Sequence, residues 1–201
     1  KIVSVTNETE LNYVNEIDKN KSPIHVSNGI RHNQFLKLNA LTASEENKFT
    51  ISYIGNIGLA QDLTTLIEAA LKLPNFSFRI VGTGIEESKI RELINKYELK
   101  NVILTGLVSW EEVINNYNLS HVLYAQLAPD FSGAMPSKLY EYLATGKYVL
   151  YGGEGQAMTT LAVFDNNCVI PPCNVNSLVE NLNELSQNMN RAYLSQSNKD
   201  I

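Results

Sequence analysis

Strand-like and helix-like segments alternate from residue 49 to residue 188, and this alternation limits the fold more than any other feature. Short segments rich in β-branched and aromatic residues indicate strands, and the segments between them carry apolar residues at helical spacing. No hairpin signals separate the strands, so parallel pairing through right-handed crossovers is expected. The predicted fold class is α/β, a doubly wound parallel sheet. The expected strands are 49–55, 76–82, 101–106, 121–126, 148–152 and 167–170, and the expected helices are about 62–73, 86–98, 110–118, 136–145, 156–164 and 175–188.

The first 48 residues do not follow this pattern. The segments "KIVSV" and "PIHVSNGI" indicate strands, and apolar residues at helical spacing lie between them. A polar connector follows from about residue 36 to residue 48. We therefore expect four parts: a remnant of a preceding domain (1–35), a linker (36–48), the main domain (49–190) and a C-terminal tail (191–201). The first residue is not methionine, so we expect a piece of a longer chain.

Composition excludes several kinds of partner and site. With 16 Lys and Arg against 21 Asp and Glu, the net charge is −5, and no basic face indicates nucleic-acid binding. Cys168 and Cys173 have no companion ligands nearby, so we expect two free thiols in a reducing compartment and no zinc site. No apolar run approaches the roughly 20 residues of a membrane helix, and no signal peptide begins the chain. We expect a cytoplasmic protein.

Glycines follow most of the expected strands. Ligands of doubly wound sheets bind at the carboxyl ends of the strands, where the loops read "GNIGLAQ", "GTGIEE", "GLVSW", "QLAPDFSGAMP" and "GGEGQ". In the first loop, Gly55 and Gly58 leave two interpretations open: amides that cradle a phosphate, or a tight turn that needs glycine for steric reasons. "IVGTG" lacks the third glycine of a dinucleotide fingerprint, so NAD is not expected.

The segment "PSKLYEYLATGK" places a lysine and a glutamate on one short helix. Pro136 suits a first helical position and leaves the amides of Ser137 and Lys138 free. A helix start beside an ammonium can bind an anion. Lys138 and Glu141 are three residues apart and share a side of the helix, so they either face one ligand or form an ordinary surface ion pair.

Together these segments resemble the C-terminal, nucleotide-sugar-binding domain of group 1 glycosyltransferases. These are retaining enzymes with two facing Rossmann-like domains, the GT-B fold. Residues 1 to about 35 resemble the tail of the N-terminal acceptor domain. The segments that carry the resemblance are "YIGNIGLAQDLTTLIEAA", "FRIVGTG", "NVILTGLVSWEEV", "PSKLYEYLATGKYVL" and "CVIPPCNVNSLVENL".

The resemblance implies roles for individual residues. Glu141 matches the second of two family glutamates set eight positions apart, the one that holds the ribose hydroxyls. The first falls at Gly133, so a carboxylate near the donor sugar is absent. The phosphate-binding arginine and lysine of the first loop correspond to Asn56 and Gln61, and we expect Lys138, in the "PSK" variant of the motif, to take over part of their charge.

The candidate residues form two sets. Lys138 and Glu141 are the candidate catalytic residues. Gly82 and Gly84 resemble the loop near the nucleotide, the backbone of Leu107 and Val108 resembles the base-reading segment, and the loop 152–155 resembles one that reaches the donor or acceptor. The donor-binding candidates are Gly55, Asn56, Gly58, Gly82, Gly84, Leu107, Val108, Pro136, Ser137 and Leu139.

The leading hypothesis is the donor-binding half of a glycosyltransferase that transfers a sugar with retention from a nucleotide diphosphate sugar, UDP-linked by expectation. The acceptor would be a polysaccharide or a lipid-linked sugar bound by the N-terminal domain, with peripheral contact at the inner face of the membrane. No D-x-D sequence occurs, so no metal or other cofactor is expected, and Lys138 with backbone amides would stabilise the leaving diphosphate. This chain alone would be inactive. The alternatives are a sugar-nucleotide epimerase of the same fold and a non-catalytic nucleotide-sugar-binding module.

Overall fold

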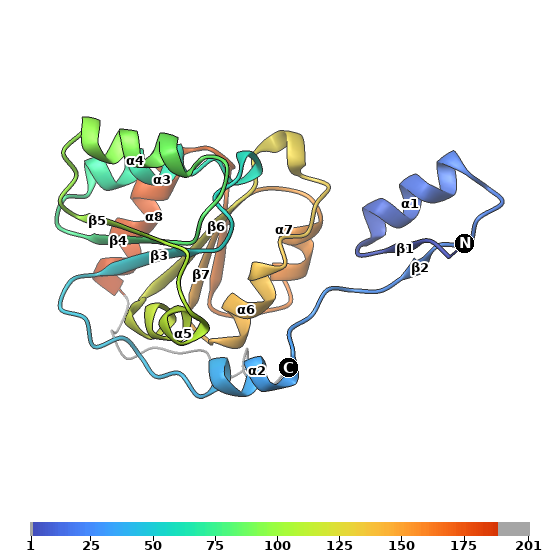
Figure 1. The fold of residues 1–201 in the computed structure, drawn as a ribbon, viewed down its shortest axis with the longest axis horizontal. Coiled ribbons are helices and arrows are strands. Elements are labelled where there is room, and N and C mark those ends of the chain that lie inside the picture. The colour runs from blue at the N-terminus through green and yellow to red at the C-terminus, as the bar shows by residue number, and fades with distance from the viewer. Residues whose placement is uncertain (1, 189–201) are drawn as a thin grey trace.

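A computed structural model describes residues 2–188 and contains one six-stranded sheet and one two-stranded sheet (Figure 1). The large sheet has the order β5-β4-β3-β6-β7-β8, and every neighbouring pair is parallel. The order reverses between β3 and β6, as in a doubly wound sheet. The predicted fold class is therefore confirmed. The strands are β3 (Thr50–Ile54), β4 (Ser77–Val81), β5 (Val102–Gly106), β6 (Val122–Gln126), β7 (Tyr148–Gly152) and β8 (Asn167–Ile170).

Each expected helix of the main domain is present. Local signals fix some of their ends: the Ser109 hydroxyl accepts a hydrogen bond from the amide of Glu112, and the Glu112 carboxylate accepts one from the amide of Ser109, so this capping box starts α5. Two short 3₁₀ helices, η1 (Leu59–Gln61) and η2 (Pro129–Phe131), lie in loops. The helices are α3 (Thr64–Lys72), α4 (Glu87–Lys96), α5 (Trp110–Leu119), α6 (Lys138–Ala144), α7 (Gln156–Leu161) and α8 (Val175–Asn188).

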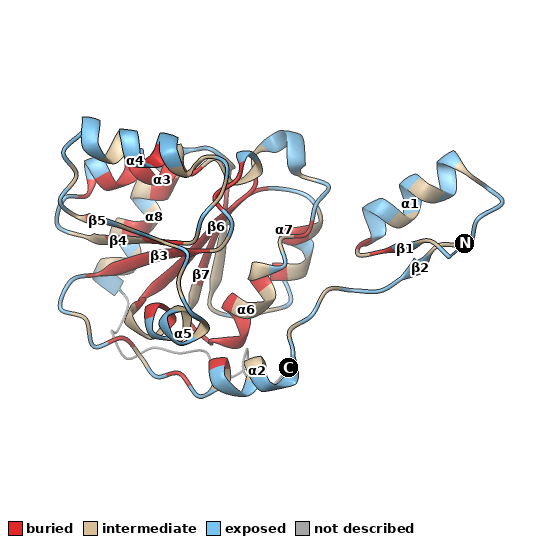
Figure 2. Ribbon diagram, in the orientation of Figure 1, coloured by how far each residue is buried: buried red, intermediate tan, exposed pale blue. Residues whose placement is uncertain are grey.

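The strands alternate their side chains between two apolar clusters, one on each face of the sheet. In β3, Tyr53 joins the cluster under α3, α4 and α8, whereas Ile54 joins the cluster under α5, α6 and α7. β6 and β7 alternate in the same way, because successive side chains of a strand point to opposite faces. Both faces are therefore covered: β3 and β6 are buried along their length, and β7 is buried from its second residue onward (Figure 2).

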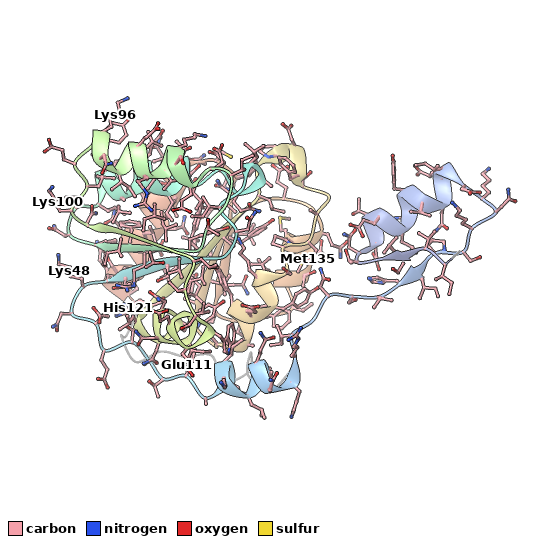
Figure 3. The ribbon with its side chains drawn as sticks, viewed as in Figure 1. Lys48, Lys96, Lys100, Glu111, His121 and Met135 are labelled. Carbon is pink, nitrogen blue, oxygen red and sulfur yellow. The ribbon has the colours of Figure 1, made fainter. Side chains whose placement is uncertain are left out.

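A small N-terminal unit lies beyond the carboxyl ends of the large sheet's strands (Figure 1). It consists of β1 (Ser4–Val5), α1 (Glu8–Ile17) and β2 (Ile24–His25), with β1 and β2 parallel. Met135, in the loop before α6, lies on the side of the domain that faces this unit, whereas Lys48 and Lys100 lie at the opposite end of the sheet (Figure 3). The loops expected to carry chemistry therefore lie between the sheet and the N-terminal unit.

The expected connector contains a helix that the sequence analysis did not predict. Helix α2 (His32–Asn39) continues past residue 36, and Leu38 is fully buried in the cluster that also contains α6. Phe35 and Leu38 are three residues apart, so they lie on one side of the helix and pack together on the domain. The first part of this segment is therefore a packed element rather than an open linker.

Candidate active site

The candidate site lies where the sheet reverses its strand order. β3 and β6 pair only at Ile51–Val122 and Ser52–Leu123, so the last part of β3 has no strand partner on that side. The Tyr142 hydroxyl fills this gap: it accepts a hydrogen bond from the Ile54 amide at 2.8 Å and donates one to the Ile54 carbonyl at 3.1 Å. Helix α6 is thereby attached to the end of β3, and its first residues stand at the switch point where ligands of such sheets bind.

The glycines at the strand ends serve close packing between loops. A Cβ on Gly82 would lie 2.0 Å from the Gly55 carbonyl oxygen, and a Cβ on Gly84 would lie 2.2 Å from the Ile57 carbonyl oxygen. Gly82 also has a φ of +134°, which disfavours other residues. In the first loop, the amides of Gly55 and Ile57 donate to backbone carbonyls, and the Gly58 amide donates to the Gln61 side chain. These three amides are engaged within the protein, which favours the steric interpretation of these glycines.

Lys138, the first residue of α6, extends across the end of β3. Its ammonium donates a hydrogen bond to the Tyr53 hydroxyl and lies 3.9 Å from the centre of the Tyr53 ring. Burial lowers the pKa of Lys138 to about 7, although the nearby Glu141 carboxylate acts in the opposite direction. The side chain therefore holds a titratable amine at the wall of the site.

Glu141 lies one turn further along α6 and has a different partner. Its Oε2 accepts a hydrogen bond of 2.9 Å from the Tyr117 hydroxyl of α5. Burial raises the pKa of Tyr117 well above its usual value, with smaller contributions from Tyr142 and Glu141, so this hydroxyl keeps its proton and donates. Among residues 2–188, Lys138 and Glu141 form no ion pair with each other. The surface ion pair that the spacing allowed is therefore not what the structure contains.

Seven of the predicted donor-site residues meet in one pocket of about 210 Å³ between the ends of β3 and β4 and the starts of α5 and α6. They come from four separate loops or helix starts, so only the fold brings them together. The pocket is lined by Ile54, Gly55, Val81, Gly82, Leu107, Val108, Trp110, Val113, Ser137, Lys138 and Glu141.

The other five candidates do not line this pocket. Gly58 and Gly84 belong to the packed loops, and Asn56 accepts a hydrogen bond from Tyr53 through its backbone carbonyl. The Leu139 side chain is fully buried in the core, and its amide donates to the Pro136 carbonyl. Leu139 therefore shapes the start of α6 from inside the core.

Gly133 has room for the carboxylate that the family pattern places there. The residue is exposed, and a Cβ would meet only the Thr9 methyl group of α1, at an ordinary 3.5 Å. The missing side chain is thus a chemical difference that sterics do not impose. A side chain at position 133 would therefore reach α1 of the N-terminal unit.

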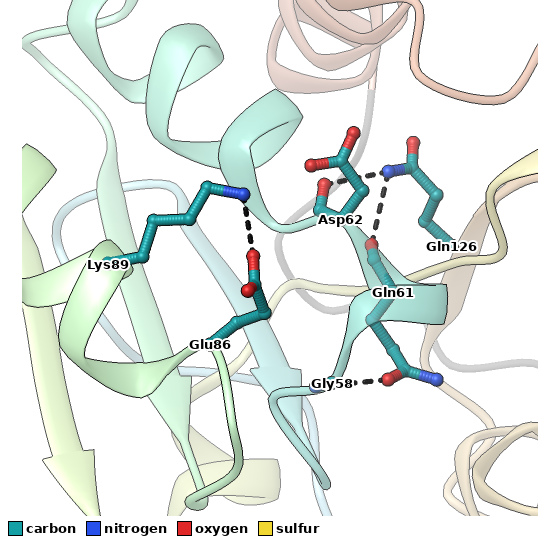
Figure 4. Close-up of polar contacts among 6 residues, drawn as sticks. All are labelled: Gly58, Gln61, Asp62, Glu86, Lys89 and Gln126. Carbon is teal, nitrogen blue, oxygen red and sulfur yellow. Dashed lines mark hydrogen bonds and ion pairs between the residues drawn. The ribbon is translucent and has the colours of Figure 1, made fainter.

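A buried glutamine holds the first loop beside the site (Figure 4). The Gln126 amide nitrogen, at the end of β6, donates to the carbonyls of Gln61 and Asp62 at 3.1 and 2.9 Å. Its oxygen accepts from the Tyr124 hydroxyl and from the Cys173 amide. Gln126 therefore links the loops after β3 and β8 to the end of β6.

Sequence reasoning missed the residues that surround the two charged groups. Trp110 and Val113 line the pocket from α5, and Tyr53 and Tyr117 hold Lys138 and Glu141. Their only sequence signal was apolar or aromatic character within an expected strand or helix, which indicates a core position. The part of the chain that the structure describes contains no group of three or more His, Cys, Asp or Glu side chains placed to bind a metal ion.

A comparison with models of protein families identifies the family of the chain. The model of the family described as "Glycosyl transferases group 1" matches residues 37–200. The chain belongs to this family. A search of curated protein sequences found no match to this chain.

Solved glycosyltransferase structures share the fold. Sucrose-phosphate synthase from Thermosynechococcus elongatus is 19% identical, with a TM-score of 0.79, and the match covers 99% of this chain and 52% of that one. S. aureus TarM, solved with UDP, is 18% identical with a TM-score of 0.73 over 95% of this chain and 38% of that one. Anabaena HepE, solved with UDP and glucose, is 16% identical with a TM-score of 0.74 over 99% and 57%. The group 1 chain thus spans roughly two to three fifths of these structures.

These likenesses support the fold class of this group 1 family member. Its six-stranded parallel sheet with flanking helices matches the Rossmann-like domains of GT-B enzymes. None of the helices within residues 2–188 is long and apolar enough to cross a bilayer.

Proposed function

We propose that the pocket binds the nucleoside diphosphate part of a UDP-linked sugar and that the chain is the donor-binding half of a retaining glycosyltransferase. The observation that carries the proposal is that Lys138 and Glu141 line one pocket at the switch point while each is held by its own tyrosine. Because Lys138 and Glu141 do not form an ion pair with each other, both side chains can interact with a ligand. TarM and HepE, which share the fold, were solved with UDP.

Glu141 is assigned to the ribose. Its carboxylate accepts one hydrogen bond from Tyr117, and an ionised carboxylate has further acceptor positions for two neighbouring hydroxyl groups. Tyr117 is fully buried and fixes the direction of the carboxylate. The apolar wall formed by Leu107, Val108 and Trp110 is assigned to the base.

Lys138 is assigned to the diphosphate. In a transfer reaction the bond between the sugar and the diphosphate breaks, so negative charge grows on the leaving oxygen. A positioned cation at that oxygen stabilises the transition state, and removal of one such donor typically costs about 3 kcal/mol in the barrier. Asn56 and Gln61 supply no charge, so Lys138 carries this role within the pocket.

The proposal is tested by calorimetric titration with UDP, GDP and ADP. We expect UDP to bind, and Lys138→Met and Glu141→Gln each to weaken binding by roughly 5- to 150-fold, the equivalent of about 1–3 kcal/mol for a charge-assisted hydrogen bond. Glu111→Gln is the matched control, because Glu111 is exposed on α5 and does not line the pocket. Absence of binding to all three nucleotides, or full affinity in both pocket variants, would refute the proposal.

A non-catalytic nucleotide-sugar-binding module is the second candidate. It is favoured by Gly133, which lacks a carboxylate where one would fit, and by Gln61, whose side chain accepts a hydrogen bond from Gly58. Both candidates predict UDP binding. They differ in catalysis: if the whole protein is a transferase, it should slowly release UDP from a UDP-sugar, whereas a binding module should not. A coupled assay for UDP measures this release.

Retention, the polysaccharide or lipid-linked acceptor, and the inactivity of this chain alone remain part of the proposal. In this proposal the acceptor approaches from beyond the carboxyl ends of the strands, the side on which the N-terminal unit lies (Figure 1). The cytoplasmic location and the contact with the inner face of the membrane stay predictions.

A further inference from the structure

Lys138 reaches Tyr53 by an unusual route. The two residues belong to opposite faces of the sheet, since α6 packs on one face and the Tyr53 side chain joins the core of the other. The lysine crosses the end of β3 over Gly55, where a Cβ would lie 2.9 Å from its Cε and 3.0 Å from its Nζ. Any side chain at position 55 would therefore displace the amine.

Tyr53 supplies two favourable contacts to the amine and is itself fixed. Its hydroxyl accepts a hydrogen bond from Lys138 and donates one to the Asn56 carbonyl, and its ring lies under the ammonium. The Tyr53 residue is fully buried, and burial holds its pKa well above the usual range. The hydroxyl thus stays neutral and offers the ammonium a dipole and a π face, but no negative charge.

The titratable groups that face Lys138 come from three elements. They are Tyr53 from β3, Glu141 and Tyr142 from α6, and Tyr117 from α5, which acts through its hydrogen bond to Glu141. Glu141 is the one carboxylate among them, and its Oε2 bonds Tyr117 rather than Lys138. The surroundings of the Lys138 amine therefore tolerate its neutral form. The pocket beside it is the one proposed to bind the negatively charged diphosphate.

We propose that Tyr53 is a positioning residue that holds the Lys138 amine in reserve at the pocket wall, and that the arriving diphosphate causes this amine to take up one proton from solvent. The inference rests on the proposed function, because it needs a diphosphate in this pocket. In this step Lys138 Nζ gains a proton, the buffer loses one, and no other bond forms or breaks. A dianion beside the amine favours the charged form, which is the form that binds it.

Proton uptake is measured by titrating UDP in buffers of different ionisation enthalpy. Without a ligand the pKa of Lys138 is about 7, so most of the amine is neutral at about pH 8. We therefore expect the binding of UDP at that pH to be accompanied by the uptake of nearly one proton. The phosphate of UDP is then already ionised, because its second pKa is about 6. In Lys138→Arg the guanidinium is always charged, so buffer-dependent heat should vanish.

The hydroxyl of Tyr53 is tested by the pH profile of UDP affinity in Tyr53→Phe, which keeps the ring. Without the Tyr53 hydroxyl as acceptor, the charged form of Lys138 is less stable and its pKa is lower. The affinity for UDP should therefore begin to fall at a lower pH than in the wild type. At about pH 8 we expect about 5- to 10-fold weaker binding. A purely structural effect would weaken binding equally at every pH. Tyr148→Phe is the control, since Tyr148 is a partly buried tyrosine of β7 that does not line the pocket.

The outcomes separate the two proposals. If the wild-type chain binds no UDP, the proposed function fails. If it binds UDP without proton uptake, or if wild type and Tyr53→Phe show the same pH profile, the proposed function stands and the role of Tyr53 is refuted. Should Tyr53→Phe fail to fold, the proton count of the wild type and of Lys138→Arg still decides whether Lys138 is the group that takes up the proton.

Discussion

Lys147 should be one of the most important single side chains for the stability of the domain. It lies between α6 and β7 and is 2% exposed. Its ammonium donates hydrogen bonds to three carbonyls: Thr42 in the connector at 3.0 Å, Asn118 near the end of α5 at 3.1 Å, and Ser120 before β6 at 2.8 Å. One buried charge thus joins three segments, and it lies at a helix C-terminus, where a cation is favoured.

The substitution Lys147→Met keeps the apolar stem and removes all three donors. Hydrogen bonds to charged groups contribute roughly 1.5–3 kcal/mol each, but the bonds to one ammonium are not additive, and the cost of burying the charge disappears with it. We therefore expect a net loss of about 3–5 kcal/mol, similar to breaking a buried ion pair. At roughly 2–4 °C per kcal/mol for a domain of this size, the melting temperature should fall by about 6–20 °C.

Urea unfolding followed by circular dichroism measures this loss. Lys72→Met is the matched control, because Lys72 is exposed and makes one hydrogen bond, of 2.8 Å, to Asn176; it should cost less than about 1 kcal/mol. A loss below about 1 kcal/mol for Lys147→Met, or one equal to that of the control, would show that the three contacts do not stabilise the fold as argued.

Three further changes test other parts of the domain. Gly82→Ala should destabilise the protein by at least about 2 kcal/mol and weaken UDP binding, because its Cβ would lie 2.0 Å from the Gly55 carbonyl; Gly29→Ala, with nothing within 4 Å, should be nearly neutral in the same melting assay. Gln126→Leu should cost about 2–4 kcal/mol and speed amide hydrogen exchange in the loop around η1, since two loop carbonyls lose their donor. The pKa of Lys138 is about 7 in the folded state and 10.5 when unperturbed, so between these pH values the unfolded chain binds more protons and the stability of the wild type rises with pH. Lys138→Met should remove this rise. Urea titrations at several pH values would measure it.

Local patterns were sufficient for the elements of the large sheet. All six strands and six helices of the main domain lie within a few residues of the predicted ranges, because period-two and helical spacing of apolar residues persist through each segment. Leu139, Tyr142 and Leu143 are buried as their spacing on α6 predicts. Helix α2 was not predicted, because it is short and apolar on only one side, so polar residues dominate its composition.

The sequence predicted the edge of the sheet at which the candidate residues lie, but not the contacts that they make. A parallel sheet with reversed strand order places its pocket at the carboxyl ends of the strands, so Lys138 and Glu141 could be assigned to that edge from sequence alone. Their partners, Tyr53 and Tyr117, lie 85 and 24 residues away along the chain. No local pattern distinguishes these tyrosines from ordinary core residues.

The sequence by itself therefore determined the order of strands and helices, the class of fold and the edge of the sheet where chemistry is expected. It could do so because these properties follow from the short-range periodicity of apolar side chains and from the handedness of crossovers. Only the tertiary structure decided that Lys138 crosses β3 over Gly55, that Lys147 is buried among three carbonyls, and that Gly82 serves loop packing. Those roles depend on which distant segments come within a few ångströms of one another, and two lysines of the same segment differ only in what surrounds them.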